Sequence, residues 1–355
     1  MEVYWCWLCG QKGIYRPHIR ALLQHFKTPQ NVYEASDEEL DKCSFLFPKQ
    51  RQRLKRAKRE DDFWHGLKTQ GIQFISARHP EFPKSLRDIP DAPFGLFYKG
   101  RLPQETRKTV AMVGARACSY YGRKIAAEIA NALAGCGIQV VSGMALGIDC
   151  HSQSAALEAG GDSFAVLGCG VDICYPARNR ELYQRLKEQG GILSEYPPGT
   201  EPLAHHFPVR NRLISGLSQV VLVIEAREKS GSLITADCAL EQGRDVMAVP
   251  GRMGDPLSGG CNHLIAQGAG IILSVEDLLS LLEIPVGGIK NTKNNQIPLE
   301  TKEKLVYSCL DLQPVSLEEL ILRTHLLAPE VMSILTSLLL KGYIQEPMKN
   351  YYAKS

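Results

Sequence analysis

The chain has 355 residues, of which 44% are hydrophobic and 22% charged, and its net charge is only +3. This composition is ordinary for a globular protein, and the length predicts two or three domains. No apolar run reaches membrane-spanning length and the first ten residues are too short for a signal peptide, so we expect no membrane association.

Residues 1–70 are predicted to form a helical domain, similar to SAM or helix-hairpin-helix domains. The segment KQRQRLKRAKR (49–59) holds seven basic residues and no acidic one. It is either a solvated helix face or a nucleic-acid contact. Cys6 and Cys9 form a lone CxxC with no second pair, which disfavours a zinc site. Eleven cysteines, several of them inside apolar runs, indicate reduced thiols in a cytoplasmic protein.

Residues 71–283 are predicted to form an α/β domain with an N-terminal extension, in which GIQFISARHPEFP to GLFYKG adds strands. Short runs rich in Val and Ile alternate with helix candidates such as 121–135. Runs without polar alternation fit strands that are buried on both faces of a parallel sheet. The order predicts a doubly wound Rossmann-like domain. The expected strands are 109–114, 138–143, 163–168, 191–196, 220–226, 245–251 and 270–274.

Residues 284–299 are predicted to be a linker, because they are rich in Gly, Asn and Lys. Residues 300–355 then read as three helices and a hairpin, the pattern of a winged-helix-like domain. Ser316 and Glu319 have the spacing of a capping box for the second helix. Pro329 suits an early position of the third helix, which we expect to end near Gly342.

In a parallel sheet, ligands bind at the carboxyl ends of the strands, so the loops there should carry the function. The first strand of the central domain is followed by GARACSYYG, where Gly114 allows a tight turn, Arg116 projects from the loop and Gly122 lies near the next helix start. Ser119 is a further candidate in this loop. The second strand ends at Ser142 and Gly143 without the acidic residue that would hold a ribose, so no dinucleotide cofactor is expected.

The strongest anion-binding loop is predicted at KSGSLITA (229–236). Its small residues allow backbone N–H groups to approach a ligand, and a helix beginning near Leu233 would direct its positive end there. The candidate residues are Lys229, Ser230, Gly231 and Ser232. The serines could equally serve as helix caps, because capping and phosphate contact use the same geometry. No Gly-Lys-Ser/Thr motif is present, which excludes a P-loop ATPase.

Arg210, Asn211 and Arg212 are predicted to lie at the start of the helix before the fifth of these strands. We expect one arginine to reach the carboxyl edge of the sheet and the other to pair with a carboxylate such as Glu225. No acid, base and nucleophile accompany them, and HExxH and GxSxG are both missing. We therefore expect a site that binds an anion, and no enzyme.

Seven segments between about residues 95 and 275 together resemble, in order, the DNA-processing protein A (DprA/Smf) family. They are VAMVGARACSYYG, VVSGMALGID, AVLGCGVDICYP, SEYPPGTEP, FPVRNRLISGL, EAREKSGSLITA and AVPG…GCNHLIAQGA. By this resemblance Arg116 falls on the arginine of the family's Gly-Ser-Arg loop, with Ala115 in place of Ser. Arg210 to Arg212 fall on its FPxRNR block, and Lys229 to Ser232 on its KSGS loop. Gln153 stands where the family usually has a histidine.

The resemblance implies a protein of natural transformation that binds and protects single-stranded DNA and loads the RecA recombinase onto it. It also implies a homodimer, for which the apolar stretch around Leu264, Ile265 and Ile271 is a candidate contact. A single-strand-binding protein is a further candidate partner. The alternative is a nucleotide-binding enzyme like the phosphoribohydrolases, although their Pro-Gly-Gly-x-Gly-Thr loop is missing.

Overall fold

The computed structural model describes residues 1–57, 63–284 and 299–354. The chain divides into two compact units, one made of residues 1–117 and 126–286 and the other of residues 118–125 and 287–355. Within the part of the chain that the structure describes, no helix combines the length and the apolarity that crossing a bilayer needs.

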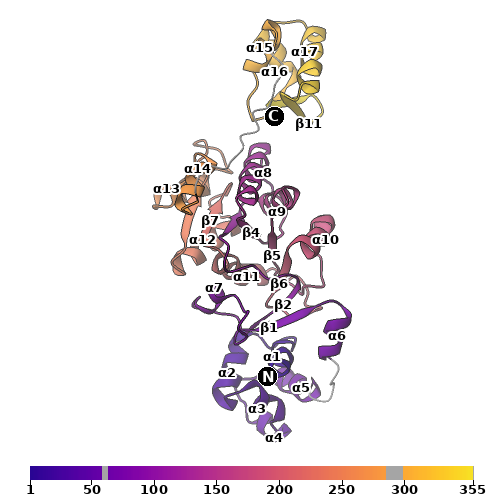
Figure 1. Cartoon of the computed structure of the whole chain (residues 1–355), viewed down its shortest axis with the longest axis vertical. Coiled ribbons are helices and arrows are strands. Elements are labelled where there is room, and N and C mark those ends of the chain that lie inside the picture. The colour runs from indigo at the N-terminus through magenta and orange to yellow at the C-terminus, as the bar shows by residue number, and fades with distance from the viewer. Residues whose placement is uncertain (58–62, 285–298, 355) are drawn as a thin grey trace. The chain divides into compact units, whose positions relative to one another are not determined.

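The N-terminal segment is helical, as predicted (Figure 1). Its helices are α1 (Glu2–Cys9), α2 (Arg16–Phe26), α3 (Pro29–Glu34), α4 (Asp37–Asp41), α5 (Pro48–Ala57) and α6 (Phe63–Thr69). Most of the basic segment lies on α5, where Leu54 and Ala57 are buried while Arg53 and Arg56 are exposed. Residues 58 and 59 of this segment lie outside the described residues. This exposure fits a solvated helix face, and a nucleic-acid contact would need the same exposure.

The larger unit is built on a nine-stranded sheet in the order β1-β2-β6-β5-β4-β3-β7-β8-β9. The strands are β1 (Gln73–Ser76), β2 (Gly95–Gly100), β3 (Thr109–Val113), β4 (Gln139–Ser142), β5 (Ser163–Val166), β6 (Gly191–Ser194), β7 (Val220–Val223), β8 (Asp245–Ala248) and β9 (Gly270–Ile271). β2 pairs antiparallel with both β1 and β6, and all other pairings are parallel. This confirms the doubly wound Rossmann-like sheet and the strands of the N-terminal extension.

The chain reverses its winding direction between β3 and β7, which are neighbours in the sheet. Such a switch point leaves a crevice at the carboxyl ends of the two strands, where ligands bind in open α/β sheets. The connecting helices are α7 (Lys84–Arg87), α8 (Tyr120–Gly135), α9 (Ile148–Glu158), the short 3₁₀ helix η1 (Ala177–Asn179), α10 (Arg180–Gln189), α11 (His206–Gly216), α12 (Gly231–Glu241), α13 (Gly259–Ala266) and α14 (Val275–Leu281).

One hydrophobic cluster joins the N-terminal helices to the sheet. Leu22 and Leu54 of the helices belong to the same buried cluster as Phe97 and Ile192 of the sheet. Burial of these side chains stabilises both parts together, because apolar area of both is removed from water in one shared cluster. The boundary expected at residue 70 is a change of secondary structure within one continuous core.

The C-terminal unit has the predicted three helices and hairpin. They are α15 (Thr301–Ser308), β10 (Val315–Ser316), α16 (Leu317–Thr324), α17 (Ala328–Leu340), β11 (Ile344–Met348) and β12 (Tyr351–Lys354), with β12 between the other two strands. Ser316 caps α16 by accepting a hydrogen bond from the Glu319 N–H at 3.2 Å, and the Glu319 carboxylate contacts Arg323. Leu320, Leu335 and Leu338 form part of a separate core. Most of the expected linker, residues 285–298, lies outside the described residues.

Candidate nucleic-acid interface

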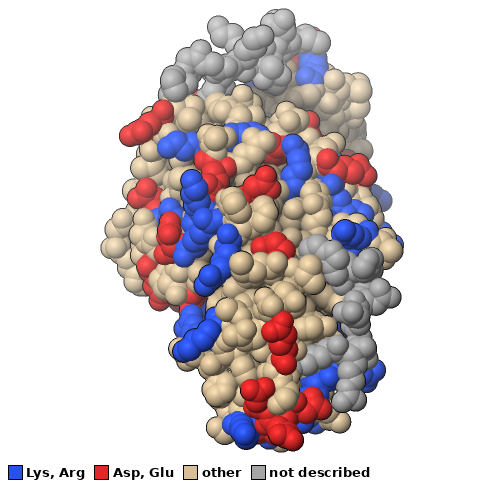
Figure 2. All heavy atoms as spheres, turned by 60° about the horizontal axis from the view of Figure 1, so that its bottom comes forward, with Lys and Arg blue, Asp and Glu red and all other residues tan. Residues whose placement is uncertain are grey.

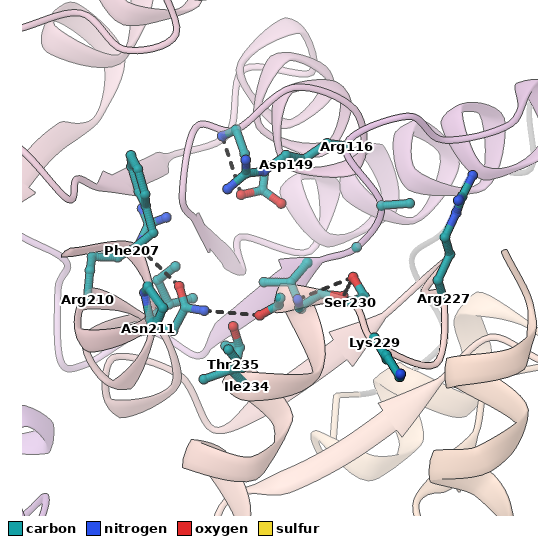
Figure 3. Close-up of a pocket in the computed structure, with 18 of the residues that line it drawn as sticks. Arg116, Asp149, Phe207, Arg210, Asn211, Arg227, Lys229, Ser230, Ile234 and Thr235 are labelled. Carbon is teal, nitrogen blue, oxygen red and sulfur yellow. Dashed lines mark hydrogen bonds between the residues drawn. The ribbon is translucent and has the colours of Figure 1, made fainter. Parts of the chain in front are cut away.

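A cavity of about 630 Å³ opens at the carboxyl ends of β3, β4, β5 and β7 (Figure 3). The loops after these strands and the helices α11 and α12 provide its walls. Its polar and aromatic lining residues are Arg116, Asp149, Tyr175, Phe207, Arg210, Asn211, Arg227, Lys229, Ser230, Ser232 and Thr235. The cavity therefore lies at the edge of the sheet where the parallel strand pattern predicts a ligand.

Arg116 is held at the rim by the loop after β3. A side chain on Gly114 would place its Cβ 2.6 Å from Ile148 Cγ1 and 2.9 Å from the Glu225 carbonyl oxygen, so only glycine fits. The next residue, Ala115, donates its N–H to the same carbonyl at 2.7 Å. This close packing fixes the backbone while the Arg116 side chain remains exposed, with its guanidinium 5.8 Å from the centre of the Phe207 ring.

The N-terminus of α12 forms the opposite wall. The helix begins at Gly231, two residues before the predicted start, and Ser230 is its N-cap. The Ser230 hydroxyl lies 3.4 Å from the Ser232 N–H that it accepts and 2.8 Å from the Ser232 hydroxyl. Lys229, directly before the cap, is exposed. The helix end and this lysine both favour an anion.

Arg210 lies in the middle of α11, not at its start, and is 5% exposed. Its Nη1 donates to the Gly143 carbonyl at 3.0 Å and also to the Val166 carbonyl, and so joins the ends of β4 and β5. A Cβ on Gly143 would lie 2.6 Å from the guanidinium. The Gly143 N–H in turn donates to Asp149 Oδ2 at 3.0 Å. Arg210 thus forms part of the cavity wall, with its Nε and Nη1 donors used by the protein.

Burial perturbs both charges of this wall. It lowers the pKa of Arg210 to about 10, although Asp149 nearby favours the charged guanidinium. Burial also raises the pKa of Asp149, against the opposing effects of Arg210 and of the N–H groups that the carboxylate accepts. Each charge is costly without the other, so the two residues act as one structural unit. Asn211 adds to this support, because its Nδ2 donates to the Gly231 carbonyl at 3.2 Å and links α11 to the start of α12.

Arg212 requires a correction. Its Nη2 lies 2.5 Å from Glu195 Oε2, so its partner is Glu195 and not the expected Glu225. The Arg212 side chain is buried and does not line the cavity. It lies two residues after Arg210 in α11 and therefore points from another face of the helix. We therefore assign Arg212 a structural role. Ser119 and Gly122 do not line the cavity either; the Ser119 hydroxyl accepts the Gly122 N–H at 3.0 Å and caps α8.

The structure adds residues that sequence reasoning missed. Tyr175 and Phe207 stack at a centroid distance of 5.5 Å and an interplanar angle of 25° in the cavity wall. Arg227, which follows β7 within the quoted segment EAREKSGSLITA, is exposed at the rim. The signal that could have found Tyr175 and Arg227 is their place in loops that follow strands. Phe207 and Asp149 lie on helices and gave no comparable signal.

The face of the molecule that Figure 2 shows is not uniformly basic. In the view of Figure 2, Lys and Arg side chains alternate with Asp and Glu side chains and form no continuous basic face. Arg116, Arg227 and Lys229 are the exposed cations among the described lining residues of the cavity. Attraction of an anion is thus a local property of the loops.

Fold and site together define a Rossmann-like α/β protein with a cationic, aromatic cavity at its switch point and a C-terminal winged helix. Residues 73–283 match the family model described as DNA recombination-mediator protein A, and residues 290–346 match the DprA winged helix domain. The chain therefore belongs to the DNA recombination-mediator protein A family.

Individual relatives agree. The chain is 46% identical over 202 residues to the DNA processing protein DprA of Streptococcus pneumoniae, which covers 57% of this chain and 71% of the relative. It is 41% identical over 225 residues to the Bacillus subtilis DprA, covering 63% and 75% of the two chains.

Two solved structures are similar. The X-ray structure of the S. pneumoniae DprA matches 79% of this chain and 98% of that chain, with a TM-score of 0.67 and 37% identity. The Helicobacter pylori DNA processing protein A, whose structure concerns a single-stranded DNA binding mode, matches 59% and 96% of the two chains, with a TM-score of 0.53 and 30% identity.

Proposed function

We propose that this protein binds single-stranded DNA in the cavity at the β3–β7 switch point. Backbone phosphates contact Arg116, Lys229 and the N-terminus of α12, and a base packs against Tyr175 and Phe207. The observation that carries this proposal is the presence of exposed cations and a stacked aromatic pair in one cavity. Those are the two components of binding to single strands with little sequence preference. The similarity to the H. pylori protein supports it.

We propose further that the cavity binds DNA and catalyses no reaction on it. Its described carboxylate, Asp149, accepts backbone N–H groups and faces the Arg210 charge. A carboxylate engaged in this way is poorly placed to take a proton from a substrate. His206, the buried histidine of this region, belongs to a different cavity. The alternative, a phosphoribohydrolase-like enzyme, thus gains no support from these residues.

Family membership supports the rest of the proposed role. The protein acts in the cytoplasm during natural transformation, protects incoming DNA and loads RecA onto it, with a single-strand-binding protein as a further partner. It acts as a homodimer that uses the stretch around Leu264, Ile265 and Ile271. Of these three, Leu264 is buried and Ile271 is 46% exposed, so Ile271 is the side chain most available to a second copy.

The test is a titration of single-stranded and double-stranded DNA of equal length over a range of salt concentrations. We expect a preference for the single strand and a linear fall of log affinity with log salt, with a slope of about −0.7 per phosphate contact. Equal affinity for both DNA forms, or binding that is indifferent to salt, contradicts the proposal. Hydrolysis of a nucleoside monophosphate by the purified protein would favour the enzyme instead.

A further inference from the structure

A second cavity, of about 230 Å³, lies between the N-terminal helices and the first turn of α11. The residues around it come from the loop before α2 and the start of that helix, from the segment just before β2, from the loop after β6 and from α11. Those that carry the argument are Tyr15, Phe94, Glu195, Tyr196, His206 and Val209. None of them lines the first cavity.

Aromatic rings form much of this wall. Tyr196 stacks on His206 with centroids 4.1 Å apart and planes at 26°. Tyr15 meets both rings edge-on, at 6.3 Å from Tyr196 and 6.0 Å from His206. On another side, Phe94 stacks on Trp5 at 6.0 Å. The cavity therefore has aromatic walls, which suit a planar aromatic guest.

The polar groups of the cavity include two hydrogen-bond acceptors, beside the Arg16 guanidinium, which can only donate. His206 Nδ1 lies 3.1 Å from the Gly168 carbonyl oxygen, which can only accept, so Nδ1 carries the proton. Burial and the neighbouring His205 lower the pKa of His206, more than the Gly168 and Glu201 carbonyls raise it. The ring is then neutral at pH 7, and its Nε2 is an acceptor.

That acceptor has no hydrogen-bond partner among the described residues, although the His206 side chain is 2% exposed. The second acceptor is the Glu195 carboxylate, which is held by Arg212 at 2.5 Å. A buried acceptor without a donor is unfavourable, so a guest that brings N–H donors gains most from this cavity.

The first turn of α11 separates the two cavities. Phe207 and Pro208 line the first cavity, while His206 and Val209 line the second. Directly before this turn, Ala204 lines the first cavity and His205 lines the second, and both residues are exposed. A strand bound in the first cavity can therefore continue over this turn into the second.

We propose that the second cavity is a subsite for an amino-bearing base (cytosine, adenine or guanine) of the same DNA strand that occupies the first cavity. The proposal rests on the proposed function. The ring faces stack on the base, and His206 Nε2 and Glu195 accept hydrogen bonds from its amino group. Carboxylates accept from the cytosine amino group in the same way in other DNA-binding proteins.

The experiment compares two oligonucleotides of equal length, one alternating dT with dC and the other alternating dT with dU. The two strands differ only in the base that alternates with dT. Cytosine carries an amino group at the ring position where uracil carries a carbonyl. The test variant is Val209→Trp, which fills the second cavity from a position that is 44% exposed and does not line the first. Leu240→Trp, on α12 at 61% exposure, is the matched control for an added surface ring.

We expect the wild-type protein and Leu240→Trp to bind the dC strand several-fold more tightly than the dU strand. Val209→Trp should bind the dC strand about tenfold more weakly than the wild type does and lose the preference, because the base no longer stacks. Tyr15→Leu, which removes one ring without filling the cavity, should reduce the preference in the same direction. Thermal unfolding of each variant confirms that it is folded.

Unchanged affinity and unchanged preference in folded Val209→Trp overturn the subsite. Arg116→Ala, measured in parallel, separates the two proposals: if it weakens binding and Val209→Trp does not, the first cavity stands and the second proposal fails. If the wild type binds no single strand at all, the proposed function fails as well. Binding of free cytidine that Val209→Trp abolishes, in the absence of strand binding, would make the cavity a nucleoside site and also overturn the proposal.

Discussion

Replacing Arg210 by methionine tests whether this buried arginine supports the cavity wall or binds DNA. In the structure it donates to the carbonyls of Gly143 and Val166 and faces Asp149 from a position that is 5% exposed. Methionine retains much of the side-chain volume but offers no donor and no charge. The substitution therefore leaves two buried carbonyls without this donor, and it leaves the buried Asp149 carboxylate without the nearby positive charge that favours its ionised form.

The expected cost follows from these contacts. Removing one partner of a buried charge pair typically costs about 3–5 kcal/mol. A buried carbonyl that loses its hydrogen-bond donor costs roughly 1–3 kcal/mol, and this cost overlaps with the cost of removing the charge. We take about 4 kcal/mol in the free energy of unfolding as the central value. For a unit of this size that corresponds to a fall in Tm of roughly 10 °C.

The pH dependence of the loss identifies Asp149 as its source. Burial already raises the pKa of Asp149, and without Arg210 it rises further. A carboxyl group with a higher pKa in the folded state binds more protons when folded, so stability falls as pH rises through that range. The deficit of Arg210→Met should therefore be smaller at about pH 5 than at about pH 8. Adding Asp149→Asn, which keeps the acceptor without the charge, should restore part of the stability.

The assay is thermal unfolding of the wild type and the variants, with DNA binding measured on the folded protein. Arg227→Met is the matched control, because Arg227 is an exposed arginine of the same cavity, and it should change stability by less than about 0.5 kcal/mol. The reasoning is refuted if Arg210→Met melts within a degree or two of the wild type and loses its DNA affinity. Arg210 would then be a ligand arginine.

Three further outcomes are expected. Arg116→Ala should weaken single-strand binding for all sequences with nearly unchanged Tm, because the side chain is exposed; wild-type affinity in the folded variant would remove Arg116 from the site. Deleting residues 296–355 should cost less than about tenfold in single-strand affinity, roughly 1.4 kcal/mol, and a larger loss in a binding titration would assign DNA contacts to the winged helix. Glu303→Gln should destabilise that domain at neutral pH but not near pH 2, as followed by circular dichroism. Hydrogen bonds from Lys341 and Ser337 lower the pKa of Glu303 to about 2. The stability that a lowered pKa provides is lost as pH falls from the pKa of the unfolded chain through the pKa of the folded protein. Equal destabilisation at both pH values would contradict this.

The strands and the functional loops could be predicted from sequence because their signals are local. Runs such as VVLV in β7 are apolar without alternation, and only a strand covered on both faces accommodates them. Their order along the chain then places the following loops on one edge of the sheet. Arg116 and Lys229 could be assigned to the cavity for this reason alone, before any contact was known.

The roles of Arg210 and Arg212 could not be predicted, because they depend on partners that are distant in the chain. Arg212 pairs with Glu195 of the loop after β6, and Arg210 meets the ends of β4 and β5. Their spacing in the sequence predicts that the two side chains point in different directions, but it does not predict which residues each one contacts. The Tyr175–Phe207 pair has the same origin, since its rings come from two segments that only the folded sheet brings together.

The arginines near the cavity nevertheless fall into two groups, which differ in whether folding removes the guanidinium from water. The first group lies in loops that follow strands, and the second lies on a helix that packs on the sheet. A loop that follows a strand leaves its side chains at the edge of the sheet, where a guanidinium can keep its water and exchange it for a phosphate. A helix that packs on the sheet, as α11 does, removes the guanidinium from water on folding, so acceptors within the protein replace the water only in part. Arg212 Nη2 meets Glu195, while its Nε and Nη1 are buried without a hydrogen-bond partner among the described residues. Arg116 and Arg227 belong to the first group, and Arg210 and Arg212 to the second. The phosphate binding that we propose for the exposed cations thus depends on the buried pair, because Arg210 joins the ends of β4 and β5 and Arg212 ties α11 to the loop after β6.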